Sequence, residues 1–395
     1  MTKLKNGLKV AYKKTREKAV YLELLVKAGS GHEEPTAKGV AHYLEHVKFN
    51  TEKYGETEAI FRVAKENSIQ LNAYTWKRET VYTIKALPES LEFGLGLLNQ
   101  IVFNSKLTKA CIEKERGIIQ NEIIRRPEFL KEHALNSKVF EGINADNVIG
   151  LTEQVAAITL EDITNFQEKY YVPNNMCLII AGPCGKQKEV LEKVVPIFGD
   201  YEKKNIKKTT KNKLQKKDSI IFNEKEDQTY KINIASVIPE AKETLAERIL
   251  QNAAVRCINE KLTDYFREEL SMVYNVFSWR EKLEKETTFS TRTDLRGKTE
   301  VLDFLDKYKT FRPLIAEKMN ETDVNRNIKG MVTEKRFQED DSNNFIDEII
   351  NFELHGQKRT SEKEVLETLN ALTFEQVKTE IEKILKEEFY TVVSN

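Results

Sequence analysis

The sequence has no excess of either charge and no long apolar run. Its 395 residues include 63 Lys and Arg against 63 Asp and Glu, a balance that gives no reason to expect nucleic acid or an anionic membrane as a partner. No apolar stretch approaches the ~20 residues that cross a bilayer, and the first residues lack the apolar segment of a secretory signal. We therefore expect a cytoplasmic protein with no membrane and no nucleic acid among its partners.

Cysteine is also scarce. The four cysteines are scattered without a CxxC pair, which argues against a disulfide framework and against a zinc site built from cysteines. They are expected to be reduced, packed thiols.

Length and charge patterning predict two domains. Single domains usually run to ~100–200 residues, and residues 203–217 contain eight lysines with hardly an apolar residue. A run of this kind is more typical of a solvated linker than of a binding patch. The expected organisation is a first domain at 1–200, a Lys-rich linker at 201–218 and a second domain at 219–395.

Periodicity predicts a mixed α and β fold. Alternation and β-branched residues predict strands at Leu8–Tyr12, Val20–Ala28, Thr80–Ala86 and Met176–Ala181. Helical periodicity covers Val40–Asn50, Thr57–Asn67, Leu87–Phe103, Thr108–Arg125, Leu130–Phe140 and Leu160–Tyr170.

The second half repeats the order of the first. A strand at Lys231–Val237 is followed by a helix at Ala241–Glu269 and a strand at Met272–Trp279. ITLEDITNFQEKYY (158–171) and LTFEQVKTEIEKIL (372–385) match in residue type almost position by position, and each precedes a short strand. An internal duplication is the simplest explanation.

The stretch HYLEH carries the clearest chemical signal. His42 and His46 are four residues apart, so on a helix they share one face and can place their imidazole nitrogens on one metal ion. Glu45 lies beside that face, within reach of a metal-bound water. The alternative is a solvated helix face with chance histidines.

A catalytic zinc usually takes three protein ligands and leaves one position open, so a third ligand is expected elsewhere. In KACIEKERGIIQNEIIRR (109–126), Glu115 and Glu122 are seven residues apart on one face of the expected helix. Periodicity alone would also permit two surface glutamates there.

These residues together resemble a known motif. HYLEH, followed 76 residues after His46 by Glu122, resembles the inverted zinc motif of the pitrilysin family, which includes insulysin and the mitochondrial processing peptidases. LKNGLKVAYKK, AGSGHEE, LNAYTWKRETVYT and YYVPNNMCLIIAG resemble the family's successive landmarks in the right order. The resemblance covers nearly the whole chain and is closest to the small two-domain prokaryotic type.

The resemblance implies a fold and an activity. The expected fold is α+β, with two duplicated α/β domains, each a mainly antiparallel sheet packed with helices, that together form one half of a clamshell. The expected activity is that of a zinc metalloendopeptidase with one Zn²⁺ per chain. The implied ligands are His42, His46 and Glu122, with Glu45 as the general base that activates a zinc-bound water and Glu115 as a carboxylate that orients the site.

The resemblance also implies substrate-binding residues. Asn72 and Ala73 of LNAYT match the strand to which family members add the peptide, although a bare strand edge is the alternative. Arg267 and Tyr274 in YFREELSMVYNVFS match a pair that holds the substrate and stabilises the oxyanion, although alone such a pair is ordinary surface chemistry. Asn67 and Ser68 replace the paired glycines of relatives, and Leu270 to Val273 also depart from their pattern, which leaves substrate preference open.

The same comparison predicts an assembly. Longer family members carry four such domains as two halves that close around a peptide, and this chain supplies two. Because it carries both the zinc motif and the Arg267/Tyr274 pair, we expect a homodimer whose active sites are completed in trans and which cleaves short or unfolded peptides. The alternatives are a catalytically silent subunit or one partner of a heterodimer.

Overall fold

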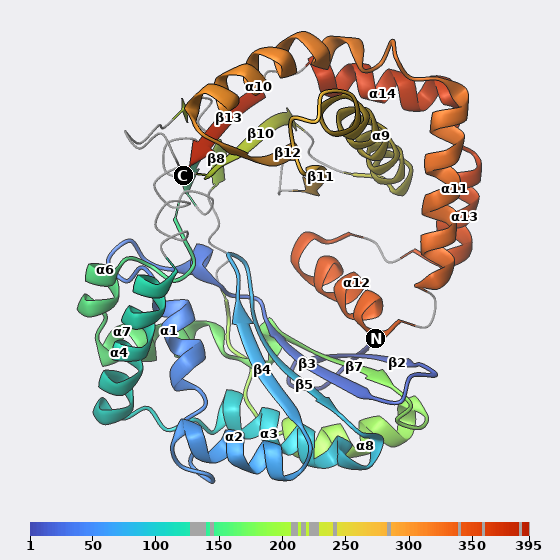
Figure 1. Cartoon of the computed structure of the whole chain (residues 1–395). Coiled ribbons are helices and arrows are strands. Elements are labelled where there is room, and N and C mark those ends of the chain that lie inside the picture. Colours follow the sequence, from blue (N-terminus) through green and yellow to red (C-terminus); the bar gives the residue numbers. More distant parts are fainter. Residues whose placement is uncertain are drawn as a thin grey trace. The chain divides into compact units, whose positions relative to one another are not determined.

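Two mixed sheets, each with its own apolar core, organise the computed structural model of this chain (Figure 1). The first unit consists of Met1–Ser137, Glu141–Lys213 and Asp340–Gly356, and the main segments of the second are Leu214–Glu339 and Gln357–Asn395. The structure describes all residues except 127–139, 143–145, 207–211, 215–218, 221–228, 240–242, 283–285, 339–340, 358–359, 387–388 and 395.

The first unit is built on a six-stranded sheet in which only one strand pair is parallel. Its spatial order is β1 (Thr2–Lys3), β2 (Lys9–Lys14), β7 (Met176–Gly182), β3 (Val20–Val26), β5 (Thr80–Ala86) and β4 (Gln70–Thr75). The parallel pair is β2 with β7. β4 stands at the end of this order, so its outer edge pairs with no strand among the described residues.

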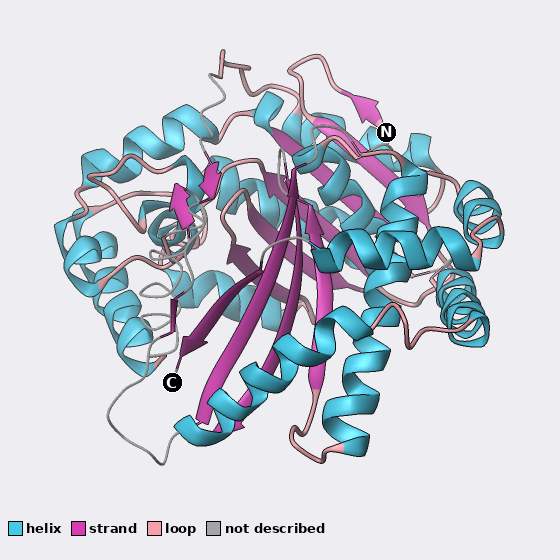
Figure 2. Cartoon of the chain, turned by 90° about the horizontal axis from the view of Figure 1, so that it is seen from above, coloured by secondary structure: helices cyan, strands magenta, loops and turns pink. Residues whose placement is uncertain are grey.

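Helices bury one face of this sheet. They are α1 (Val40–Val47), α2 (Thr57–Glu66), α3 (Leu91–Phe103), α4 (Lys109–Arg125), α6 (Thr152–Ala157), α7 (Leu160–Tyr170) and α8 (Gln187–Phe198), with short 3₁₀ turns at Ser30–His32, Pro88–Ser90 and Pro173–Asn175. Alternate residues of β3, such as Leu22 and Leu24, enter this core because successive side chains of a strand point to opposite faces. Figure 2 shows the strands with helices packed about them.

Helix α12 (Ser342–His355) covers part of the other face of the same sheet, although it comes from the second half of the sequence (Figure 1). Phe345, Ile346 and Ile349 pack on residues of β2, β3, β5 and β7. The carboxylate of Glu353 accepts hydrogen bonds from Lys9 at 2.7 Å and from Lys27 at 3.1 Å. Residues 340–356 fall in the sequence range expected for the second domain, yet they belong to the first unit.

The second unit contains a five-stranded sheet in the order β11 (Val276–Lys282), β12 (Glu286–Arg296), β10 (Thr229–Pro239), β13 (Phe389–Ser394) and β9 (Ser219–Ile220). Its helices are α9 (Leu245–Thr263), α10 (Lys298–Phe311), α11 (Glu321–Phe337), α13 (Glu362–Asn370) and α14 (Phe374–Lys386), with a π-helical turn at Asp264–Glu269 and a 3₁₀ turn at Arg312–Leu314. A separate two-stranded sheet pairs β6 (Phe140–Gly142) with β8 (Asn212–Leu214).

The two sheets have the same topology. The order β2-β7-β3-β5-β4 in the first unit corresponds to β9-β13-β10-β12-β11 in the second. In both, the single parallel contact lies between the first two strands of that series, and the other contacts are antiparallel. The predicted α+β class with duplicated, mainly antiparallel sheets is therefore confirmed.

Most predicted elements of the first half form at nearly the predicted positions, and the departures are local. Among the described residues of the helix predicted at Ala241–Glu269, Leu245–Thr263 form a regular α-helix, which continues into the π-helical turn at Asp264–Glu269. The strand predicted from Met272 begins at Val276, and Ser271, just before the predicted start, has a left-handed φ of 49°. Nearly all of the helix predicted at Leu130–Phe140, and residues 207–211 and 215–218 of the predicted linker, lie outside the described residues.

None of the helices in the described part of the chain is both long and apolar enough to cross a membrane.

Candidate metal centre

Helix α1 contains the HYLEH stretch and packs one of its faces against the core. Its residues Val40, Tyr43, Leu44 and Val47 are buried in the core of the first unit. These positions follow the three- and four-residue spacing of one helix face. His42 and His46 therefore share another face, with their ring centroids 4.7 Å apart.

The start of α1 is fixed by a buried carboxylate. Gly39 precedes the helix with a left-handed φ of 90°, a conformation that glycine adopts without a Cβ clash. The two oxygens of Glu33 accept hydrogen bonds from the backbone N–H groups of Gly39 and Ala41, each at 2.9 Å. They satisfy donors that a helix N-terminus leaves unpaired.

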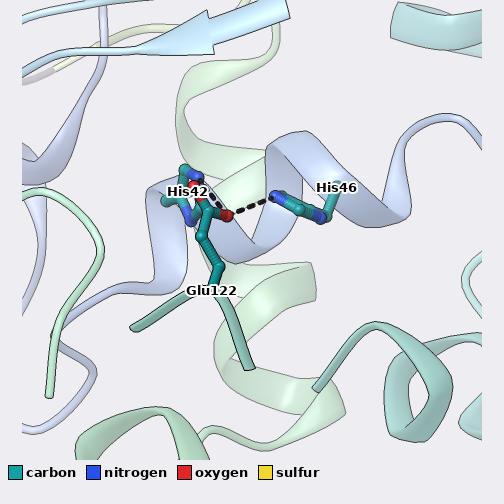
Figure 3. Close-up of side chains that lie close together, drawn as sticks. All are labelled: His42, His46 and Glu122. Carbon is teal, nitrogen blue, oxygen red and sulfur yellow. Dashed lines mark ion pairs between the residues drawn. The ribbon is translucent and has the colours of Figure 1, made fainter. Parts of the chain in front are cut away.

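Helix α4 brings the third predicted ligand to the histidines. Oε2 of Glu122 lies 3.7 Å from Nε2 of His46 and 4.0 Å from Nε2 of His42 (Figure 3). One ligand atom from each of the three residues falls within 4.8 Å of the others. Ligands on a tetrahedral zinc stand ~3.3 Å apart, as their ~2.0–2.2 Å bonds require, so these atoms are somewhat farther apart and the side chains would close around an ion of this kind.

The protonation of the histidines also suits a metal. Burial, with the neighbouring His46 as a second cause, lowers the pKa of His42 to about 3, so its imidazole is neutral and has a free lone pair. Within the described part of the chain, its buried Nδ1 atom has no hydrogen-bond partner. For His46, burial pushes the pKa down, but the hydrogen bond to Glu115 and the nearby carboxylates outweigh this and raise the pKa. A cation bound at this cluster would replace the proton that these carboxylates favour.

Glu115 lies behind His46 rather than beside the ligand atoms. Its Oε2 is 3.2 Å from Nδ1 of His46, and its Oε1 accepts a hydrogen bond of 3.1 Å from the hydroxyl of Thr57. The Glu115 residue is only 2% exposed. A carboxylate that accepts from Nδ1 fixes the ring orientation and leaves Nε2 for a metal.

Glu45 is held by a threonine of the neighbouring strand. It is 7% exposed, and Oγ1 of Thr75 donates a hydrogen bond of 2.6 Å to its Oε2. Burial raises the pKa of Glu45, and the Thr75 hydrogen bond works against that rise. A carboxyl group with a raised pKa beside a metal site is suited to accept and return a proton.

The site opens into a cavity of about 640 Å³. His42, Glu45, His46 and Glu122 line it, as do Asn72 and Ala73 of β4; its apolar lining includes Phe49, Phe61, Trp76 and Ile118. Asn72 is exposed and Ala73 half-buried. Because β4 is an edge strand, its main chain can pair with an added peptide strand.

Arg267 and Tyr274 lie in the second unit. Arg267 belongs to the π-helical turn, and its guanidinium carbon is 5.7 Å from the centre of the Tyr274 ring. Tyr274 is 88% exposed and lies in the loop before β11. The His42, His46 and Glu122 cluster is complete within the first unit without these two residues.

Three neighbours of the site were not predicted from the sequence: Glu33, Thr57 and Thr75. Thr75 had a usable signal, because it ends the LNAYT stretch and shares a strand face with Ala73. Thr57 had no such signal, because its partner Glu115 is 58 residues away. Glu33 had none either, because the backbone of Gly39, to which it binds, lies across a turn.

The corresponding helices of the second unit contain ion pairs instead of a metal cluster. By chain order, α9 and α11 correspond to α1 and α4. Lys261 on α9 pairs with Asp323 on α11 at 2.8 Å, and Glu260 pairs with Arg326 and accepts from Asn327. Among the described residues, the only group suited to hold a metal is that of the first unit.

Comparison with known families gives two adjacent matches. Residues 9–149 match the sequence model of insulinase, peptidase family M16, and residues 157–331 match that of the peptidase M16 inactive domain.

Curated relatives match about half of the chain at about 30% identity. They include the mitochondrial-processing peptidase subunit beta of Rattus norvegicus (31% identity; 51% of this chain, 42% of the relative) and the probable zinc protease PqqL of Haemophilus influenzae (31%; 46% and 21%). The mitochondrial cytochrome b-c1 complex subunit 1 of Bos taurus matches as well (30%; 46% and 39%). Each match spans less than half of the relative's own length.

Solved structures share the fold over the whole chain. A protease from Helicobacter pylori superposes with a TM-score of 0.86 at 18% identity, covering 99% of this chain and 98% of that one. A peptidase M16 inactive domain from Pseudomonas fluorescens gives 0.83 at 14% identity, covering 99% and 97%. At these identities the likeness establishes the fold alone.

Proposed function

The chain belongs to peptidase family M16, the pitrilysin family, and from this premise we propose that it is a zinc-dependent metalloendopeptidase that cleaves short or unfolded peptides. The observation that carries the proposal is the cluster of His42, His46 and Glu122 with Glu45 in the same cavity. All four residues required by the inverted motif are present and close together.

His42, His46 and Glu122 would hold the ion. A bound zinc supplies a Lewis acid that polarises the scissile carbonyl and makes a water more acidic. Glu45 takes a proton from the attacking water and returns it to the leaving amine. Two facts support this role: Glu45 lines the cavity, and the hydroxyl of Thr75 holds its carboxylate by a hydrogen bond.

The peptide would bind as an added strand on β4. The unpaired outer edge of β4 and the place of Asn72 and Ala73 in the cavity lining support this mode. Main-chain pairing favours extended peptides over folded proteins. Arg267 and Tyr274 would hold the substrate and donate to the oxyanion.

The proposed assembly is a homodimer in which Arg267 and Tyr274 of one subunit act at the metal site of the other. The presence of both sets of residues in one chain supports it. A cytoplasmic location is proposed on the sequence alone; the Escherichia coli protease PqqL, a structural neighbour, is described as periplasmic.

A second candidate is a catalytically silent subunit. It is favoured by the similarity to subunit 1 of the cytochrome b-c1 complex and to a peptidase M16 inactive domain. Such a subunit would keep the fold and use the site, if at all, to complete a partner.

One experiment separates the two candidates. The purified chain is analysed for zinc and incubated with a library of quenched fluorescent peptides, alongside Glu45→Gln. About one zinc per chain with hydrolysis that Glu45→Gln abolishes supports the peptidase. Bound zinc without hydrolysis of any peptide by the wild type contradicts it and favours the silent subunit.

A further inference from the structure

The side chain of Thr75 connects the proposed general base to the proposed peptide-binding strand. Its hydroxyl donates to Oε2 of Glu45 at 2.6 Å, and the two residues are 9% and 7% exposed. A short hydrogen bond from a hydroxyl to a carboxylate is among the stronger side-chain interactions. It holds one oxygen of Glu45 and leaves the other, Oε1, for a reacting water.

The direction of this hydrogen bond follows from its neighbours. Thr80 lies opposite Thr75 in the β4–β5 ladder, and their hydroxyl oxygens are 3.4 Å apart. The Thr80 hydroxyl donates its single proton to the carbonyl of Ala28 at 3.0 Å. A carboxylate only accepts hydrogen bonds, so the hydroxyl of Thr75 donates its one proton to Glu45 at 2.6 Å rather than to the Thr80 oxygen at 3.4 Å.

Thr75 also belongs to the strand that would receive the peptide. It is the last residue of β4, and Asn72 and Ala73 lie three and two residues before it. A peptide paired along the outer edge of β4 restrains the backbone of this strand, and with it the Cα position of Thr75. The orientation of the Glu45 carboxylate then depends on the same strand that holds the substrate.

We propose that Thr75 is a positioning residue that, from the strand that would receive the peptide, holds the Glu45 carboxylate in the orientation for proton transfer. This inference rests on the proposed peptidase function. Thr75 lies in the lining of the same cavity, and the inference assigns its hydroxyl a bond to Glu45 but none to the peptide or the metal.

A purely structural role makes a different prediction. If the hydroxyl only satisfies a buried carboxylate, its loss lowers stability and leaves turnover of the folded protein unchanged. If it positions the base, its loss lowers kcat, because a misplacement of ~1 Å can cost ~10²-fold in rate. KM and zinc content stay the same, since the Thr75 hydroxyl is bound to Glu45 and is neither a proposed metal ligand nor part of the main chain that would pair with the peptide.

The test compares two pairs that differ in one hydroxyl: wild type with Thr75→Val, and Thr75→Ser with Thr75→Ala. We expect kcat to fall about 10- to 100-fold within each pair at constant KM and zinc content, and Thr75→Ser to retain most of the wild-type rate. The Ser/Ala pair keeps the test available if the valine variant folds poorly. Thr164→Val on α7, whose hydroxyl donates to Leu160 O at 2.8 Å, is the matched control.

A second readout does not depend on turnover. In a Glu45→Gln background, binding of an uncleaved peptide should be the same with Thr75 and with valine at that position. Equal kcat within both hydroxyl pairs, or a changed peptide affinity in the Glu45→Gln background, overturns the inference. Absence of hydrolysis by the wild type would instead overturn the proposed function, so the two failures are distinguishable.

Discussion

Nδ1 of His46 lies 3.2 Å from Oε2 of Glu115, while the second oxygen of that carboxylate is held by Thr57. The carboxylate is therefore anchored on one side before it orients the imidazole on the other. The arrangement leaves Nε2 of His46 directed toward Glu122 (Figure 3). It is the arrangement by which a buried carboxylate raises the ligand strength of a histidine.

Glu115→Gln should weaken zinc binding by about 10- to 100-fold, because an amide holds the imidazole less firmly and adds no negative charge. Competition with a chromophoric chelator measures the affinity directly. Glu113→Gln, on the exposed side of the same helix, is the control. An unchanged zinc affinity in Glu115→Gln would show that the carboxylate has no part in binding the metal.

Glu45→Gln should retain zinc and lose hydrolysis by about 10²- to 10⁴-fold, because an amide cannot take a proton from water. Glu122→Gln should instead lose zinc. Metal analysis and peptide hydrolysis of both variants give the comparison. Equal zinc loss in the two would assign Glu45 to the ligands rather than to proton transfer.

Mixing Glu45→Gln with Tyr274→Phe should recover activity if the sites are completed in trans. Random exchange makes half of the dimers mixed, and one site in each mixed dimer has both wild-type residues, so about a quarter of wild-type activity is expected. Hydrolysis by the mixture is compared with each variant alone. No recovery despite demonstrated subunit exchange would exclude the trans arrangement.

Lys48 should make the stability of the apoprotein depend on pH. It is 1% exposed, its Nζ donates to Val102 O at 2.8 Å, and burial lowers its pKa to about 7 from 10.5. Because the folded pKa is below the unfolded value, the folded state binds fewer protons between them. The contribution of Lys48 is complete above the unfolded pKa and is lost as the pH falls toward 7.

As the pH rises from 7 to 9.5, the free energy of unfolding of the wild type should therefore increase by on the order of 2–3 kcal/mol relative to that of Lys48→Met. Urea unfolding at the two pH values, with a chelator present, measures the difference. Lys65→Met removes an exposed lysine as the control. If the free energy of unfolding of the wild type fell relative to that of Lys48→Met as the pH rises, the lowered pKa of Lys48 would be contradicted.

Glu353→Gln should destabilise the first unit by about 1–3 kcal/mol, because two lysines lose a fully buried carboxylate partner. Urea unfolding measures this. Glu192→Gln removes an exposed pair with Lys188 and should have no measurable effect. A similar loss in both variants would show that the burial of Glu353 has no special energetic role.

Local patterns accounted for much of the first unit. The predicted strand at Thr80–Ala86 and helix at Leu160–Tyr170 form over those residues, because alternation and helical spacing reflect which side of each element is buried. The His42 and His46 pair was readable for the same reason, since four residues on a helix return to one face. Identifying Glu122 as the third ligand required the family resemblance, because no local pattern links a residue to another that is 76 positions away.

No local pattern in the sequence predicts where α12 packs. Its apolar face predicts burial but not the surface that buries it, and its contacts with β2 join residues 344 apart in sequence. Tyr274 was predicted on a strand, but it lies in the loop before β11, which begins at Val276. The contacts that place α12 join residues that no short window of sequence contains.

By itself the sequence determined the duplicated α+β class, the helix that presents two histidines and the identity of the candidate ligands, because these follow from spacing along one element or from a matched motif. Only the tertiary structure decided which groups hold those residues in place. Thr75 meets Glu45, and Thr57 meets Glu115, across separate elements. Such hydrogen bonds form only when packing brings the two elements within about 3 Å of each other.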